Sequence, residues 1–132
     1  MELKAGLEAE MTITVGEKDL ATAFGNEGVS VFGTPALLSY FEAVCRKTVE
    51  GALPEGSLTV GTWAELKHLA ATPLGMKVTL RAKLLEVDRR RLVFEAEAHD
   101  EQEKIGECQH ERYYLDASKF LAKAEEKGSP AA

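Results

Sequence analysis

The 132-residue chain has only two cysteines, Cys45 and Cys108, and they lie far apart without forming a CxxC pair. This scarcity excludes a disulfide framework and a cysteine-based metal site, so no metal is expected. Unpaired thiols are typical of proteins in a reducing compartment, and we therefore expect a cytoplasmic protein.

The chain is also short of positive charge, since 16 Lys and Arg residues stand against 22 Asp and Glu residues, for a net charge of −6. No basic face follows from the pattern, so a nucleic-acid partner is not expected. Long apolar runs are missing as well, because none approaches the roughly 20 residues needed to cross a bilayer. The first 11 residues lack the basic-then-apolar layout of a signal peptide. These absences favour a single globular domain without a membrane partner.

What the chain does contain is one long helix pattern, VFGTPALLSYFEAVCRK, from residue 31 to residue 47. Thr34 is predicted to cap this helix, because its hydroxyl oxygen can accept a hydrogen bond from a free N–H of the first turn. Pro35 suits the first helical position, where no backbone donor is needed. The helix is predicted to run to about Glu50 and to end at Gly51.

Alternation of apolar and polar residues predicts five strands around this helix. The predicted strands cover residues 7–15, 58–68, 76–84, 92–98 and 104–115. Short polar turns, such as those at 88–91 and 100–103, join the strands after the helix, which predicts an antiparallel meander. Asp116 is predicted to cap a final amphipathic helix.

Neither the long helix nor the sheet can bury its apolar surface alone, so the helix must lie against one face of the sheet. The sequence therefore predicts an α+β fold in which an antiparallel β-sheet wraps a long central helix. Residues 1–127 are expected to form this single domain, and residues 128–132 are expected to form a flexible tail.

One acid, Glu42, interrupts the apolar helix about two turns after its start. Arg46 follows four residues later, which is the favourable order for a surface ion pair worth about 0.2–0.5 kcal/mol. The alternative is a carboxylate at the mouth of a cleft, where it serves as a base or a nucleophile. The pattern alone leaves both interpretations open.

Thr34 and His68 each have two interpretations as well. Thr34 is either a plain cap or, at the positive end of the helix, part of a site for a polarised carbonyl group. His68 is either a histidine of the core or the general base best suited to neutral pH.

Three further features are open in the same way. Gly61 marks either a bulge in its strand or a place where a ligand approaches bare backbone. By pattern alone, Arg112 is a surface partner of Glu111, and His110 on the same strand has no obvious nucleophile beside it. The basic turn at 89–91 is either solvated or a contact for the phosphates of a nucleotide-bearing substrate.

Three motifs in this order carry a resemblance: Thr34-Pro35 with Glu42, then VGTWAELKHLAATPLG from residue 60, then KIGECQHER from residue 104. Together they are similar to the hot-dog-fold thioesterases of the fluoroacetyl-CoA thioesterase-like group, over about residues 7–120. The resemblance implies a hot-dog fold and hydrolysis of an acyl-CoA thioester without a metal or other cofactor. It also implies Thr34, Glu42 and His68 as the catalytic residues.

By the same resemblance, Gly61 would place its backbone beside the thioester, Arg112 would support the site, and the protein would form a homodimer with active sites at or near the subunit interface. Family members specialised for fluoroacetyl-CoA guard the acyl pocket with aromatic residues before the main helix. Segment 23–30 holds one Phe and two Gly here, so a short or medium acyl-CoA is the expected substrate. The alternatives are an acyl-CoA hydratase or dehydratase, or a non-catalytic acyl-CoA-binding module.

Overall fold

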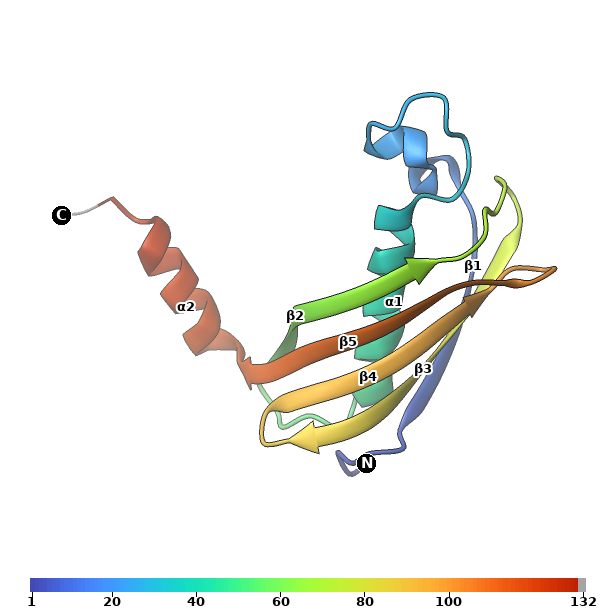
Figure 1. Cartoon of the computed structure of the whole chain (residues 1–132). Helices are drawn as coiled ribbons and strands as arrows, with labels where there is room; N and C mark the ends of the chain where they lie inside the picture. Colours follow the sequence, from blue (N-terminus) through green and yellow to red (C-terminus); the bar gives the residue numbers. More distant parts are fainter. Residues whose placement is uncertain (131–132) are drawn as a thin grey trace.

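The computed structural model describes residues 1–130, and in it a five-stranded antiparallel sheet wraps one long helix (Figure 1). The elements in chain order are β1 (Glu8–Thr14), the 3-10 turns η1 (Glu17–Asp19) and η2 (Ala21–Phe24), α1 (Thr34–Val49), β2 (Ser57–His68), β3 (Lys77–Asp88), β4 (Arg91–His99), β5 (Lys104–Asp116) and α2 (Ala117–Gly128). The predicted α+β arrangement is therefore confirmed, with all five strands and both helices near their predicted bounds.

The strands follow the order β1-β3-β4-β5-β2, so β1 and β2 form the two edges of the sheet. The prediction that β2 begins a simple meander into β3 is wrong, because β2 pairs with β5 instead. The connection from Leu69 to Met76 is not a tight turn. It is tied to the chain before α1, where the Phe32 N–H donates to the Thr72 carbonyl and Val31 forms a bridge with Pro73. This connection therefore carries the chain from one edge of the sheet toward the other.

Helix α1 lies against the concave side of the sheet and buries one face in the core. Its buried residues are Ala36, Leu37, Phe41, Val44, Cys45, Thr48 and Val49. Pro35 occupies the first turn as predicted, but the N-cap residue is Gly33 and no side chain caps the helix. The prediction that Thr34 is the cap is therefore wrong, and its hydroxyl group is free to bond elsewhere.

A bulge interrupts β2 between Gly61 and Trp63, where the register against β5 shifts by one residue. Gly61 and His68 are seven residues apart, yet both face α1, which strict alternation along a strand forbids. The extra residue of the bulge restores the facing, since one inserted residue reverses every later side chain. The regular alternation that predicted a strand over residues 58–68 therefore does not hold through the bulge.

Helix α2 leaves the end of β5 and projects away from the body of the fold, and none of its residues is buried (Figure 1). The predicted cap is confirmed, because the Asp116 carboxylate accepts a hydrogen bond from the Lys119 N–H at 2.9 Å. Gly128, predicted to begin the tail, is the last residue of α2, and residues 131–132 of the tail lie outside the described residues. Across residues 1–130, no helix combines the length and the apolar character needed to cross a bilayer.

Candidate active site

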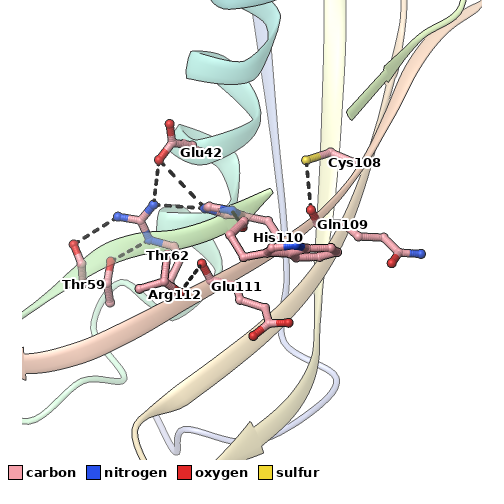
Figure 2. Close-up of polar contacts among 9 residues, drawn as sticks. Glu42, Thr59, Thr62, Cys108, Gln109, His110, Glu111 and Arg112 are labelled. Carbon is pink, nitrogen blue, oxygen red and sulfur yellow. Dashed lines mark hydrogen bonds and ion pairs between the residues drawn. The ribbon is translucent and has the colours of Figure 1, made fainter. Parts of the chain in front are cut away.

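The carboxylate of Glu42 lies against a buried arginine from the sheet (Figure 2). Its Oε2 atom is 3.2 Å from Arg112 Nη1 and 4.0 Å from His110 Nε2. Among residues 1–130 the ion-pair partner of Glu42 is Arg112, so the predicted surface pair with Arg46 is wrong. The Glu42 side chain is 36% exposed and the Arg112 side chain is 4% exposed, so the carboxylate extends from a buried cation toward solvent.

Arg112 is the centre of this cluster and uses every nitrogen of its guanidinium group. Its Nε donates to Thr59 Oγ1 at 2.9 Å and its Nη2 donates to the Thr59 carbonyl at 3.0 Å. Its Nη1 donates to Glu42 Oε2 at 3.2 Å and to His110 Nε2 at 3.1 Å. The prediction of a surface pair with Glu111 is wrong, because Glu111 instead bonds Arg91 at 2.6 Å. Burial lowers the pKa of Arg112, but an arginine has so high a pKa that it stays charged.

Gly61 makes room for this cluster. A Cβ atom at this position would lie 2.8 Å from Glu42 Oε2, 3.1 Å from His110 Cε1 and 3.3 Å from Arg112 Nη1. Gly61 therefore lies at a bulge, as one of its two interpretations predicted, and its bare backbone makes room for the Glu42 carboxylate. The approach of a ligand to this backbone stays a prediction.

Gly61→Ala is expected to lower the free energy of unfolding by about 1–3 kcal/mol, because the imidazole and guanidinium groups beneath it are buried and cannot move away. The Glu42 carboxylate can swing toward solvent, so the added methyl group should also separate it from Arg112. Urea denaturation measures the loss. Thr62→Ala, in the exposed part of the bulge, serves as control and should change stability by less than about 0.5 kcal/mol. Equal stability of the two variants would contradict the close packing at Gly61.

Thr34 and His68 form a second polar pair at the start of α1, where Thr34 Oγ1 lies 2.8 Å from His68 Nδ1. Burial lowers the pKa of His68 below its ordinary value of 6.5, so the imidazole is neutral at pH 7. Its Nε2 atom is buried and, among residues 1–130, has no hydrogen-bond partner of good geometry, although the backbone of Ala70 interacts with the ring. A neutral imidazole beside a hydroxyl group, at the positive end of a helix, can accept and return a proton.

The three predicted catalytic residues thus lie in two places. Thr34 and His68 line a hollow of about 530 Å³ at the N-terminal end of α1, and Glu42 is not among its lining residues. Thr34, Leu38 and Glu42 follow one another at intervals of four residues, so they form one ridge of α1 about 12 Å long. Strand β2 passes along this ridge, with His68 at the Thr34 end and Gly61 at the Glu42 end.

The strip of surface between the two polar pairs, formed by Leu38 of α1 and by Gly61 and Ala64 of β2, is open to solvent. Leu38 on α1 is only half-buried, and Gly61 and Ala64 of β2 are exposed although they belong to the face that looks toward α1. An extended ligand that lies on this strip would meet the hydroxyl–imidazole pair at one end and the carboxylate at the other.

Sequence reasoning missed His110 as a member of the Glu42 cluster. The only available signal was its alternation with Arg112, which placed both side chains on one face of β5.

The two cysteine thiols are poorly suited to nucleophilic chemistry. Burial raises the pKa of Cys45 to about 12 and that of Cys108 to about 11, so both thiols stay protonated and are poor nucleophiles. Among residues 1–130, no three His, Cys, Asp or Glu side chains gather where they could hold a metal ion.

The helix wrapped by an antiparallel sheet, with polar pairs along the helix ridge that faces edge strand β2, defines a protein of the hot-dog class. The model of the family FlK, described as fluoroacetyl-CoA-specific thioesterase, matches residues 15–118. The chain belongs to this family. A fluoroacetyl-CoA thioesterase from Streptantibioticus cattleyicolor is 37% identical to it over 97 residues, which are 74% of this chain and 70% of that protein.

Solved structures agree with this assignment. A variant of the fluoroacetyl-CoA thioesterase FlK in complex with fluoroacetate is 29% identical, with a TM-score of 0.90 over 97% of this chain and 100% of the other. A thioesterase superfamily member from Thermus thermophilus is 26% identical, with a TM-score of 0.85 over 92% and 90%. A hot-dog-like protein from Thermanaerovibrio acidaminovorans, 23% identical, has a TM-score of 0.87 over 96% and 94% and supports the fold. The predicted resemblance and hot-dog fold are confirmed.

Proposed function

We propose that this protein is a thioesterase that hydrolyses an acyl-CoA thioester to a free acid and CoA. The observation that carries the proposal is the placement of two polar pairs, Thr34–His68 and Glu42–Arg112, along one open strip beside α1 in a member of this thioesterase family. Thr34, Glu42 and His68 are the proposed catalytic residues, and Gly61 and Arg112 are the proposed substrate-binding and supporting residues.

In this proposal the thioester lies on the strip between the two polar pairs, within reach of Glu42, with its carbonyl oxygen directed toward the start of α1. The first turn of a helix leaves backbone N–H groups without helical partners, and their positive potential stabilises the negative charge that develops on the carbonyl oxygen. The Thr34 hydroxyl adds a donor there when His68 Nδ1–H donates to the Thr34 oxygen, because this leaves the single hydroxyl hydrogen for the carbonyl. A single donor of this kind is typically worth about 2.7–4 kcal/mol of the activation barrier.

Glu42 then acts in one of two ways. As a nucleophile it attacks the carbonyl carbon, the C–S bond breaks, CoA leaves as a thiolate that takes up a proton, and water cleaves the resulting anhydride. As a general base it removes a proton from the water that attacks. His68 moves protons in either route, to the leaving thiolate or from water. Single turnover in ¹⁸O-labelled water distinguishes the routes, because label in the Glu42 carboxylate excludes direct attack by water.

The hollow at the N-terminal end of α1 supports the proposal that the substrate carries a short or medium acyl group. Besides Thr34 and His68 it is lined mainly by apolar side chains, among them Phe24, Val29 and Leu69. Phe24 is 51% exposed, so it rims the hollow and does not fill it. An uncharged hydrocarbon chain suits such a surface, since burial of each methylene group contributes roughly 0.8 kcal/mol.

A homodimer is part of the proposal. Strand β2 is an edge of the sheet with one row of backbone groups unpaired, and its Trp63 side chain is 43% exposed. Helix α2, with Phe120 and Leu121 exposed, rises from the end of β5 on the side of β2 (Figure 1). A second copy along this edge would cover both features and close the strip beside Glu42. Sedimentation equilibrium of the wild type and of Trp63→Lys tests it, and a monomeric wild type would refute it.

A cytoplasmic location is also proposed, because a reducing compartment keeps the two unpaired cysteines as thiols.

Release of free thiol from a panel of acyl-CoA substrates, with chains from acetyl upward, is the direct test of the proposed activity. A 2-enoyl-CoA in the same panel separates hydrolysis from hydration, because hydration consumes the double bond without releasing thiol. An acyl-CoA-binding module would bind members of the panel and release no thiol from any of them, and this outcome would refute the proposed enzyme.

The pH dependence of kcat/KM should follow the neutral form of His68. Because burial lowers the pKa of His68 below 6.5, kcat/KM is expected to fall only below that pH and to stay level from pH 7 to 8. In the unfolded chain His68 has its ordinary pKa and binds a proton first, so stability should also decline as the pH falls below 6.5. An activity limb centred above pH 7 would contradict the role of His68 as a neutral base.

A further inference from the structure

His110 is buried inside the Glu42 cluster. It lies on β5 and keeps 2% of its exposure. Its ring packs against Phe94 with 6.2 Å between the ring centroids. Both of its ring nitrogens have polar partners, since Nδ1 lies 2.7 Å from the Trp63 carbonyl oxygen and Nε2 lies 3.1 Å from Arg112 Nη1.

These partners fix the proton of the imidazole. The Trp63 carbonyl oxygen has no proton to give, so Nδ1 must carry the hydrogen that forms this bond. The guanidinium group of Arg112 only donates, so Nε2 must offer a lone pair. Burial and the neighbouring charge of Arg112 both lower the pKa of His110, and the imidazole is therefore neutral. His110 is thus held as the Nδ1–H tautomer.

This tautomer determines where the hydrogens of Arg112 point. Nη1 carries two hydrogens, and with one directed to His110 Nε2 the other is directed to Glu42 Oε2 (Figure 2). Thr59 accepts hydrogen bonds at the other edge of the guanidinium group, from Nε and Nη2. Without the acceptor on His110, one hydrogen of Arg112 Nη1 loses its partner, and the contact that remains for Nη1 on this side is the partly exposed Glu42 carboxylate itself.

We infer that His110 is a positioning residue, which through Arg112 holds the Glu42 carboxylate in the orientation needed to attack or to activate water. This inference rests on the proposed thioesterase function. His110 is buried beneath Gly61 of this strip and is not exposed to a substrate that lies on it, so it acts on the substrate only through Arg112 and Glu42.

Two amide substitutions separate the two bonds of His110. In His110→Gln the amide oxygen reaches the place of Nε2 and can accept from Arg112. In His110→Asn the amide group reaches only the place of Nδ1, so the bond to Trp63 remains and the acceptor for Arg112 is lost. His110→Asn is expected to reduce kcat for acyl-CoA hydrolysis about 10- to 100-fold, with KM within about twofold, because misplacement of a catalytic group by about 1 Å has such an effect. His110→Gln is expected to recover most of this loss.

Gln109→Ala is the matched control, since Gln109 is the neighbouring residue of β5 and faces solvent. It should keep wild-type kcat and stability. Equal kcat in His110→Asn and the wild type, or equal losses in the Asn and Gln variants, would overturn the inference. If the wild type releases no thiol from any acyl-CoA, the proposed function fails instead.

Two-bond ¹H–¹⁵N correlation NMR of the wild-type protein tests the same inference without a substitution. The expected spectrum shows His110 with a protonated Nδ1 and an unprotonated Nε2, which is the minority tautomer of a free neutral histidine. A protonated Nε2 would remove the acceptor that Arg112 requires and would overturn the inference even if every variant failed to fold.

Discussion

Glu42→Gln is expected to reduce kcat for acyl-CoA hydrolysis by about 10²–10⁴-fold, the range typical for loss of a positioned acid–base group. The amide has the size of the carboxylate, and its oxygen can still accept a hydrogen bond from Arg112 Nη1, now 3.2 Å away. The substitution therefore removes the negative charge and keeps the contact. A steady-state thiol-release assay with the best acyl-CoA of the panel measures the effect.

Glu65→Gln is the control for this result, because Glu65 is an exposed acid on the same sheet that belongs to neither polar pair. It should leave kcat and KM as in the wild type. A Glu42→Gln variant that stays folded and keeps wild-type kcat would show that Glu42 serves only as an ion-pair partner of Arg112, and the catalytic assignment would be lost.

Arg112→Met is expected to give the largest loss of stability, about 2–4 kcal/mol in the free energy of unfolding. The methionine fills part of the volume but leaves the Thr59 carbonyl and His110 Nε2 without their donor. It also leaves Glu42 without its cation, although water can reach that carboxylate and reduces the cost. Urea denaturation with an unchanged slope against denaturant concentration measures the loss.

Arg81→Met provides the comparison for this prediction. Arg81 forms an ion pair with Glu10 at 2.8 Å, shorter than the 3.2 Å of the Arg112 pair, but both of its groups are exposed. An exposed pair gains little because water solvates the separate charges nearly as well. Arg81→Met should therefore change stability far less than Arg112→Met, and a similar loss in the two variants would contradict the importance of burial.

The elements of this fold could be predicted because their signals are local. The apolar pattern from Thr34 onward has the helical period, and the segments that became β3 and β4 alternate over most of their length on either side of a short turn. The cap on Asp116 was equally readable, since a carboxylate before an amphipathic segment suits a helix start. Such features depend on residues only a few positions apart.

The neighbour of β2 could not be predicted in the same way. The sequence places β2 directly before β3, and short connections favour adjacent strands. The pairing of β2 with β5 depends instead on contacts across the whole chain, including the bridge between Val31 and Pro73. The bulge at Gly61 was considered from the sequence, but its effect on the facing of His68 appears only once the partner strand is known.

The candidate site shows the same division. Thr34, Glu42 and His68 were readable as polar residues with unusual placement, and the contact between Thr34 and His68 came out as a direct hydrogen bond. The partner of Glu42 was read wrongly, because a local rule favours Arg46 and no local rule detects Arg112, which is 70 residues away. Burial converts that distant arginine into the stronger partner.

The bulge of β2 also restricts how this chain can vary in length. Loss of a single residue between Gly61 and His68 would turn the imidazole outward, while the glycine would still face the helix. An inserted residue would have the same effect. Among descendants of this chain, insertions and deletions should therefore accumulate outside these eight positions, and the spacing within them should stay constant even where the residues themselves change.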